Sequence, residues 1–252
     1  IKDGKGTESD PFIIKTVEDL VSIKNMITLA NSYYKLGNDL DLTEYISNLE
    51  TQSWEPIGNE VTPFIGNFNG NGYKITGLKI NSESEYVGLF GYTTGTISDL
   101  ILENIKIVGT KNIGGLVGYN KGKIENVEVK SGIIKGTENV GGLVGYFRAG
   151  NISNSRTSGE VEGNSKLGGL VGYIYAKDYD ATKTLQSCYS TANVTGIGNE
   201  IGGLIGYIEL ISINSSGDVA RVYTNISNVY ATGNVVSQGN NVGGLIGQIY
   251  LY

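Results

Sequence analysis

The sequence predicts an all-β protein: a parallel β-helix (β-solenoid) with coils of about 27 residues and an N-terminal α+β cap. Three observations lead to this fold class. A Gly-Leu-x-Gly motif recurs at nearly constant spacing, a second motif recurs at a fixed distance from it, and 252 residues contain 38 Gly but only 3 Pro. Glycine in excess without proline indicates many tight turns between short strands, because collagen and Pro-rich linkers both need proline.

Six copies of the Gly-Leu-x-Gly motif run through the chain, and the first five are each followed by tyrosine. Self-similarity at a fixed period of this size is typical of solenoids. A strand rises about 3.3 Å per residue, so such a unit has a contour of about 90 Å, a suitable circumference for one coil. The leucines of the six copies, which lie 27, 27, 27, 34 and 41 residues apart, are Leu89, Leu116, Leu143, Leu170, Leu204 and Leu245.

The second motif begins 18 or 19 residues before the next repeat leucine, so this segment has a fixed length. All added length enters at the turn after the motif tyrosine, which grows from 5 to 19 residues. Apolar residues fall at spacings of two and three and do not maintain the helical i, i+3, i+4, i+7 pattern, which predicts short strands. The leucine-rich repeat is the competing solenoid. The β-helix is favoured because the glycine-rich run would otherwise lie in a helical or loose segment.

Like positions of a β-solenoid stack, so some columns of side chains can be predicted. The thiol of Cys188 falls in a column with Leu100, Val127, Ser155 and Val229, which predicts a buried, inert cysteine. The repeat glycines are expected to allow close coil stacking and turns with positive φ. A ladder of side-chain amide hydrogen bonds is expected along Asp99, Asn126, Asn154, Ser187 and Asn228.

Residues 1–63 do not contain the repeat and are predicted to form a cap. Residues 64–252 are predicted to form the β-helix. Thr16 followed by Asp19 suggests a capping box that opens an amphipathic helix reaching Ala30. A cap is expected on physical grounds, because a solenoid end exposes unpaired strand edges. Strands are predicted at 11–14, 33–36 and 40–42, and a loop holds Trp54. The last apolar stretch, 245–252, ends mid-coil, which suggests truncation.

The repeat also resembles a known family. The Gly-Leu-x-Gly units, the stretches 187–196 and 228–235 before them, and the segments 54–58 and 63–78 are similar to the GLUG repeat of bacterial cell-surface proteins. Such repeats occur in adhesin-like proteins and in non-catalytic parts of immunoglobulin A1 proteases of the M26 metallopeptidase family. The resemblance implies a surface-exposed β-helical module. It brings no active site, because the M26 zinc motif is His-Glu-x-x-His and this chain has no histidine.

Composition argues against several classes of function. Without histidine and with one cysteine, a zinc site and an internal disulfide are excluded, and no metal or cofactor is expected. A net charge of -6 argues against nucleic-acid binding, and no apolar stretch is long enough for membrane insertion. Asp39 and Asp41 could hold calcium, but a short acidic edge strand is the simpler interpretation. Acidic residues such as Glu103 and Glu125 form no recurring cluster, so no catalytic residue is predicted.

The motif tyrosines Tyr92, Tyr119, Tyr146, Tyr173 and Tyr207 recur at one point of successive coils. They form either an outward strip suited to sugars or proteins, or a structural ladder. The long turns 174–184 and 208–225 adjoin this strip, and inserted turns often carry the binding face of a repeat protein. The candidate ligand-binding residues are therefore Tyr146, Tyr173, Tyr175, Tyr179, Tyr207, Arg221 and Tyr223.

These observations predict a non-enzymatic, extracellular adhesin or structural stalk of a bacterial surface protein. Its expected partners are a host or matrix glycan or protein and other domains of a larger surface protein. Two alternatives remain open. One is a carbohydrate-active β-helix enzyme, which an acid pair beside a basic residue on one face would favour. The other is an accessory domain of a secreted immunoglobulin A1-type protease.

Overall fold

The computed structural model describes residues 1, 3–27, 31–177, 183–211 and 224–252. These residues form 29 strands and two helices. Every strand pairing within the described ranges is parallel, for example β1 (Phe12–Ile14) with β2 (Tyr33–Leu36). The prediction of an all-β protein with parallel sheets is confirmed.

Three sheets contain all of these strands, and the large sheet has 17 of them. Its other members are β3 (Leu40–Asp41), β4 (Asn67–Asn69), β5 (Lys74–Thr76), β6 (Lys79–Asn81), β9 (Thr96–Glu103), β10 (Lys106–Val108), β13 (Lys123–Lys135), β16 (Asn151–Ser153), β17 (Arg156–Gly163), β20 (Lys183–Gln186), β21 (Tyr189–Ser190), β22 (Asn193–Gly196), β25 (Thr224–Ser227), β26 (Tyr230–Ala231) and β27 (Val235–Ser237).

The second and third sheets have six strands each. The second sheet consists of β7 (Glu85–Val87), β11 (Lys111–Gly114), β14 (Glu138–Gly141), β18 (Ser165–Gly168), β23 (Ile201–Gly202) and β28 (Val242–Gly243). The third sheet consists of β8 (Phe90–Thr93), β12 (Val117–Asn120), β15 (Val144–Phe147), β19 (Val171–Lys177), β24 (Ile205–Ile211) and β29 (Ile246–Leu251).

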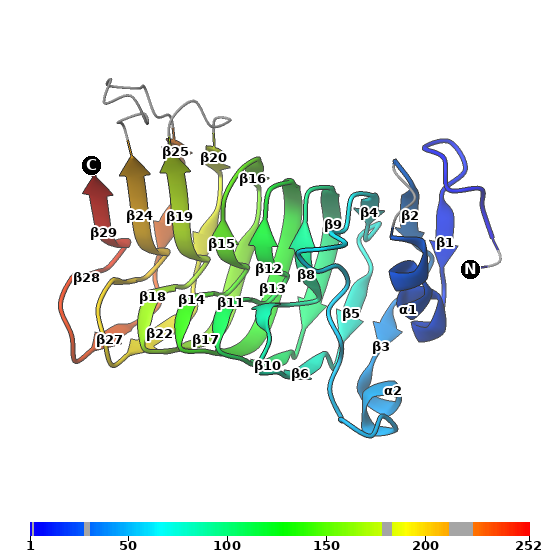
Figure 1. Ribbon diagram of the computed structural model, residues 1–252, viewed down its shortest axis with the longest axis horizontal. Coiled ribbons are helices and arrows are strands. Elements are labelled where there is room, and N and C mark those ends of the chain that lie inside the picture. Colours follow the sequence, from blue (N-terminus) through cyan, green and yellow to red (C-terminus); the bar gives the residue numbers. More distant parts are fainter. Residues whose placement is uncertain (2, 28–30, 178–182, 212–223) are drawn as a thin grey trace.

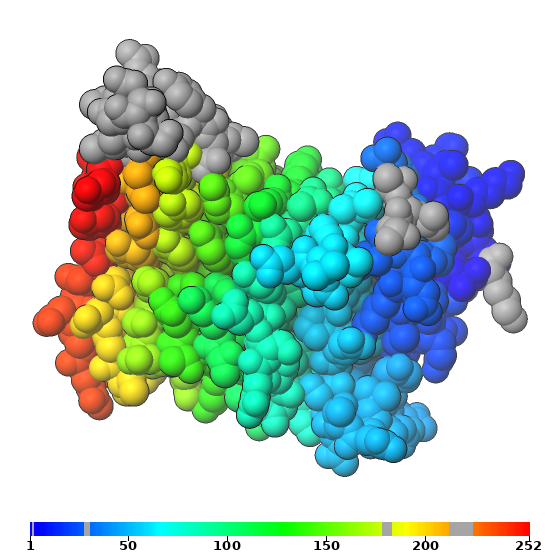
Figure 2. Space-filling view, viewed as in Figure 1, coloured from blue at the N-terminus to red at the C-terminus, as the bar shows by residue number. Residues whose placement is uncertain are grey.

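Equivalent strands of successive repeats pair with one another in register. In the third sheet Val117 lies beside Val144, and the same column continues through Val171, Ile205 and Ile246. The chain visits the large, second and third sheets in turn and then starts again one strand further on (Figure 1). The repeats follow one another from the N-terminal to the C-terminal end without a break (Figure 2).

One hydrophobic core runs through the stack from Ile14 to Ile208. The repeat leucines from Leu89 to Leu204 are fully buried, and burial of such a side chain is worth about 1.5–3 kcal/mol. Leu245 in the last repeat is 37% exposed, since no strand beyond it covers that position in the described residues. The repeated leucine is therefore the inward-facing residue of each repeat.

The repeat glycines have one of the two predicted roles, not both. A Cβ on Gly142 would lie 2.1 Å from the carbonyl oxygen of Gly169, and one on Gly145 would lie 2.5 Å from the backbone of Asn112. Close backbone approach therefore requires glycine here. The expectation of positive φ is wrong for the Gly-Leu-x-Gly glycines, because the left-handed corners are taken by other residues that stack in two columns. These residues are Tyr86, Asn112, Asn139, Lys166, Glu200 and Asn241 in one column, and Asp99, Asn126, Asn154, Ser187 and Asn228 in the other.

The predicted amide ladder forms only in part. Asn126 Nδ2 donates to Asp99 Oδ1 at 2.8 Å, and Asn69 Nδ2 donates to the other oxygen of Asp99 at 2.9 Å. Among the described residues, side-chain hydrogen bonds do not continue along the rest of this column. What its members share is a φ of 50° to 54°, a conformation that asparagine, aspartate and serine tolerate better than branched residues. Cys188 is buried as predicted, and burial raises the pKa of its thiol to about 11.

The N-terminal region begins as expected. The helix α1 (Val17–Met26) is opened by a capping box in which Thr16 and Asp19 exchange hydrogen bonds. The helix ends at Met26 rather than at Ala30, which lies outside the described residues. A second helix, α2 (Thr43–Ser47), was not predicted. Strand β2 pairs with β4, so residues before and after position 63 share one sheet.

Candidate functional site

The five motif tyrosines form one stack of rings along the third sheet, here called the tyrosine strip. Each occupies the same register position of its strand, and Gln248 holds that position in β29. Neighbouring ring centroids from Tyr92 to Tyr207 are 4.4, 4.7, 4.7 and 5.5 Å apart. Contacts at this distance stabilise aromatic pairs by about 0.5–1.5 kcal/mol each beyond the burial of area. The structure thus brings Tyr146, Tyr173 and Tyr207 together.

Cationic side chains lie over the strip. The Lys121 ammonium lies 5.7 and 5.6 Å from the first two ring centroids, and that of Lys166 lies 5.3 and 5.5 Å from the last two. Arg148 lies 4.9 Å from the ring of Tyr175 in the same way. Lys166 also forms an ion pair with Glu138 at 2.6 Å, which fixes its position. Much of the ring surface is therefore covered by other rings or by cations of the protein itself.

The long turns begin as strand. Residues 174–177 of β19 pair with residues 208–211 of β24, and from positions 175 and 209 these two strands run beyond the ends of the earlier strands. This places Tyr175 beside Tyr173, with ring centroids 6.1 Å apart, and lets the Tyr173 hydroxyl donate to Glu209 Oε2 at 2.5 Å. The predicted site residues Tyr179, Arg221 and Tyr223 lie outside the described residues.

The strip is a poorly solvated environment for a phenol. Burial is the main cause that raises the pKa values of Tyr119, Tyr146 and Tyr173, and the hydrogen bond to Glu209 adds to the effect at Tyr173. Burial and the charge of Glu209 raise the pKa of Tyr207 to about 12. These four hydroxyls stay protonated near neutral pH, so they can donate hydrogen bonds.

A buried asparagine pair belongs to the column beside the strip and was missed from sequence. Asn139 Nδ2 donates to Asn112 Oδ1 at 2.7 Å, and both residues are 2% exposed. Asn139 Oδ1 is buried without a hydrogen-bond partner among the described residues, a state that costs about 1–3 kcal/mol. The signal in the sequence is the asparagine that stands two residues before Gly114 and again before Gly141.

The acidic candidates are used by the fold. Asp39 Oδ1 accepts a hydrogen bond from the backbone of Lys74 at 3.0 Å, and Asp41 Oδ1 accepts one from Thr43 at 2.9 Å. Glu103 pairs with lysines of the coils on either side. The part of the chain that the structure describes contains no group of three or more acidic or cysteine side chains that could hold a metal.

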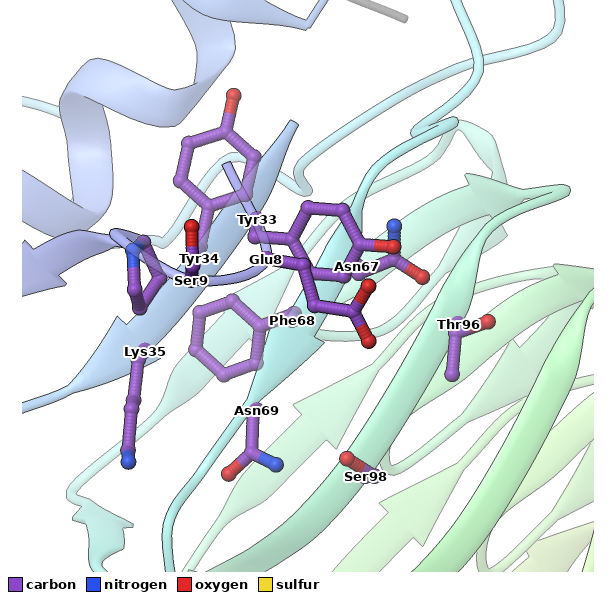
Figure 3. Close-up of a pocket in the computed structure, with 11 residues that line it drawn as sticks. Glu8, Ser9, Tyr33, Tyr34, Lys35, Asn67, Phe68, Asn69, Thr96 and Ser98 are labelled. Atoms are coloured by element: carbon purple, nitrogen blue, oxygen red, sulfur yellow. The ribbon is translucent and has the colours of Figure 1, made fainter. Parts of the chain in front are cut away.

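A cleft that the sequence analysis did not predict lies at the N-terminal end of the large sheet (Figure 3). Its volume is about 420 Å³. The signal in the sequence is a polar-apolar-polar pattern in the segments 33–35, 67–69 and 96–98. The repeat spacing does not predict that these three segments pair with one another. The lining residues are Glu8, Ser9, Pro11, Tyr33, Tyr34, Lys35, Asn67, Phe68, Asn69, Thr96 and Ser98.

The in-register stack and the strip define an all-β protein built from repeats, with parallel sheets. Two solved structures share this fold. A "putative immunoglobulin A1 protease" from Bacteroides ovatus matches with a TM-score of 0.70 over 97% of this chain and 87% of that chain, at 19% identity. An "IgA1 Protease" matches with a TM-score of 0.60 over 94% of this chain and 20% of that chain, also at 19% identity. The fold is therefore that of immunoglobulin A1 protease-related structures.

Comparison by sequence gives short matches. No protein-family model matches the chain. A "Putative Gly-rich membrane protein" of Evansella cellulosilytica is 40% identical over 89 residues, which are 35% of this chain and 10% of that protein. Halomucin of Haloquadratum walsbyi is 33% identical over 119 residues, 44% of this chain and 1% of its own length. The chain thus spans a tenth or less of these relatives. In the described ranges, neither helix has the length and apolar character needed to cross a membrane.

Proposed function

We propose that the chain is a non-enzymatic, extracellular module of a bacterial surface protein, a parallel β-helix that acts as a stalk and adhesin. The observation that carries this proposal is the in-register pairing of successive repeats around one continuous core. Such a stack is rigid along its length and presents the same side-chain columns at every level. The similarity of the motif to the GLUG repeat supports a place at the cell surface.

The proposed binding face is the later part of the tyrosine strip. Tyr207 and Tyr175 lie where the extended strands β19 and β24 leave the regular coil. Aromatic rings with polar tips, next to the guanidinium of Arg148, suit a host or matrix glycan or protein.

The test is binding of the purified chain to arrays of glycans and host proteins, repeated with the double variant Tyr175→Ala/Tyr207→Ala. We expect the double variant to bind any ligand so identified at least about tenfold more weakly, a loss of about 1.4 kcal/mol. The matched control is Tyr230→Ala, a 50% exposed tyrosine on the large sheet, which should bind as the unaltered chain does. Equal affinity of the double variant would contradict a binding role for the strip.

The second candidate is an accessory domain of an immunoglobulin A1-type protease, favoured by the fold shared with the two protease-related structures. In that case the chain binds immunoglobulin A1 without cleaving it. Binding of immobilised immunoglobulin A1, with immunoglobulin G as the control, tests this candidate. Equal binding to both antibodies, or no binding to either, would contradict this candidate.

A further inference from the structure

The cleft at the N-terminal end of the large sheet presents an ordered array of polar groups. Strands β2, β4 and β9 lie side by side, and alternate residues point outward because their neighbours Tyr34, Phe68 and Ile97 are buried. Adjacent strands are about 4.8 Å apart, so a row across three of them spans about 10 Å. The outward residues form two rows, Tyr33, Asn67 and Thr96 in one and Lys35, Asn69 and Ser98 in the other.

Most polar groups of these rows are not used by the protein. Within the part of the chain that the structure describes, the side chains of Tyr33, Asn67, Thr96 and Ser98 make no hydrogen bond to other protein groups. Asn69 is the exception: its amide donates to Asp99 at 2.9 Å and its oxygen accepts from the backbone of Asn71 at 2.6 Å. The cleft therefore has a fixed floor and several donors and acceptors that are free to bind a ligand.

A wall of the cleft comes from the segment before β1. The backbone of Tyr33 donates to Gly6 at 3.0 Å, and Asp10 accepts a backbone hydrogen bond from Lys5 at 2.9 Å, which holds this segment against the sheet edge. Glu8 and Ser9 thereby line the same space as the sheet residues. Figure 3 shows the Tyr33 ring, the Asn67 amide and the Glu8 carboxylate around this space.

We propose that this cleft binds the end of a short neutral saccharide. The aromatic face of Tyr33 suits the apolar C–H face of a sugar ring, and amide, hydroxyl and carboxylate groups suit its hydroxyls. The volume of about 420 Å³ falls within the range of about 300–1,000 Å³ typical of small-molecule sites. One carboxylate, Glu8, and one ammonium, Lys35, leave the cleft without net charge, which favours a neutral ligand.

This site is separate from the proposed binding part of the tyrosine strip, because Tyr175 and Tyr207 belong to another sheet and to later repeats. Its existence does not depend on the adhesin proposal, because a stalk or a protease accessory domain could carry the same cleft. The two sites also differ in their aromatic groups, since Tyr33 has no ring partner among the described residues whereas every strip ring has at least one.

The test uses the whole chain, titrated with maltose, lactose and N,N′-diacetylchitobiose and followed by NMR shifts of backbone amides. We expect saturable shifts at residues of β2, β4 and β9 with at least one of these sugars. Tyr33→Ala should weaken that binding about tenfold, and Asn67→Ala about fivefold, as loss of a ring contact and of hydrogen bonds requires. Unchanged amide spectra away from the cleft show that each variant remains folded.

Two controls separate this site from the strip. Tyr230→Ala removes an exposed tyrosine of the same sheet at the far end, and Tyr175→Ala removes one beside the strip. Both variants should leave the sugar-induced shifts of the β2, β4 and β9 amides as they are in the unaltered chain. The proposal is overturned when none of the three sugars gives saturable shifts, or when Tyr175→Ala abolishes binding and Tyr33→Ala does not. The second result would support the strip instead.

Discussion

The tyrosine strip and the cleft contain the same residue types in different surroundings. In the strip, each ring contacts another ring and several are covered by lysine, so the phenols mainly hold successive repeats together. In the cleft, Tyr33 stands alone beside an amide and hydroxyls that bind nothing in the described protein. The comparison teaches that a repeated aromatic residue stacks on its equivalents in neighbouring repeats, whereas the unrepeated Tyr33 leaves its ring without a ring partner among the described residues, which is why we propose the sugar site there.

Breaking the close backbone approach between repeat glycines of successive coils should have the largest effect. Gly142→Ala places a Cβ 2.1 Å from the carbonyl oxygen of Gly169, so the coils must shift apart. We expect a loss of about 1–3 kcal/mol or more in the free energy of unfolding, measured by urea denaturation. Gly244 has the same motif position, but a Cβ there meets nothing within 4 Å. Gly244→Ala should cost no more than about 0.5 kcal/mol, and equal losses would show that close approach is not the reason for glycine.

Removing one aromatic ring from each region tests the comparison directly. Tyr146 is half-buried and lies between two rings at 4.7 Å on each side, so Tyr146→Ala should cost about 1–2 kcal/mol of stability. Tyr33→Ala removes a ring without ring partners and should cost about 1 kcal/mol or less. Both values come from thermal and urea unfolding of the purified variants. A Tyr33 variant destabilised as much as the Tyr146 variant would make the cleft ring structural too.

High pH should destabilise the strip. A phenol with a folded pKa above its unfolded value, about 12 against 10.0 at Tyr207, stabilises the fold fully below pH 10.0. This stability is lost as pH rises from 10.0 toward about 12. Tyr207→Phe removes the ionisable group and should reduce the loss, as measured by urea midpoints together with phenolate absorbance. The same alkaline loss in the variant and the unaltered chain would contradict this assignment.

Low pH should have the smallest effect on the free energy of unfolding. This effect should arise in the large sheet rather than in the third sheet. Hydrogen bonds from Lys130 and Lys74 lower the pKa of Glu103 from 4.5 to about 2. A carboxylate with a depressed folded pKa contributes stability above pH 4.5, and this contribution is lost as pH falls toward about 2. Glu103→Gln should flatten the acid limb of the stability curve slightly, because such exposed pairs are weak. A steeper acid limb in the variant would reverse the predicted sign.

The repeat made the architecture predictable, because a motif with constant spacing fixes which residues share a column. The capping box at Thr16 was predictable for another reason: it is a local sequence pattern that involves only residues 16 to 19. The helix α2 was not, because it has only five residues and no side-chain cap. The positive-φ corners were assigned to glycine although asparagine and serine recur there, because amide ladders and left-handed backbone favour the same residues.

The strip could be predicted from the sequence, whereas the cleft could not. The strip follows from the tyrosine after each motif, and its stacking at Tyr146, Tyr173 and Tyr207 was one of two predicted interpretations. The cleft required knowing that β2 pairs with β4 and β4 with β9, pairings that join the non-repeating region to the repeats. The sequence shows no periodic spacing that would predict those pairings, so the residues of the cleft were not identified from sequence.

The in-register pairing of repeats also determines how the chain should respond to mechanical force. The hydrogen bonds between coils run along the axis of the stack, so tension applied at the two ends loads one layer of them at a time. Each released coil of 27 residues adds about 90 Å of contour. Under tension the molecule should lengthen one coil at a time and absorb work at each step, with equal steps for the three 27-residue spacings and longer steps for the spacings of 34 and 41 residues.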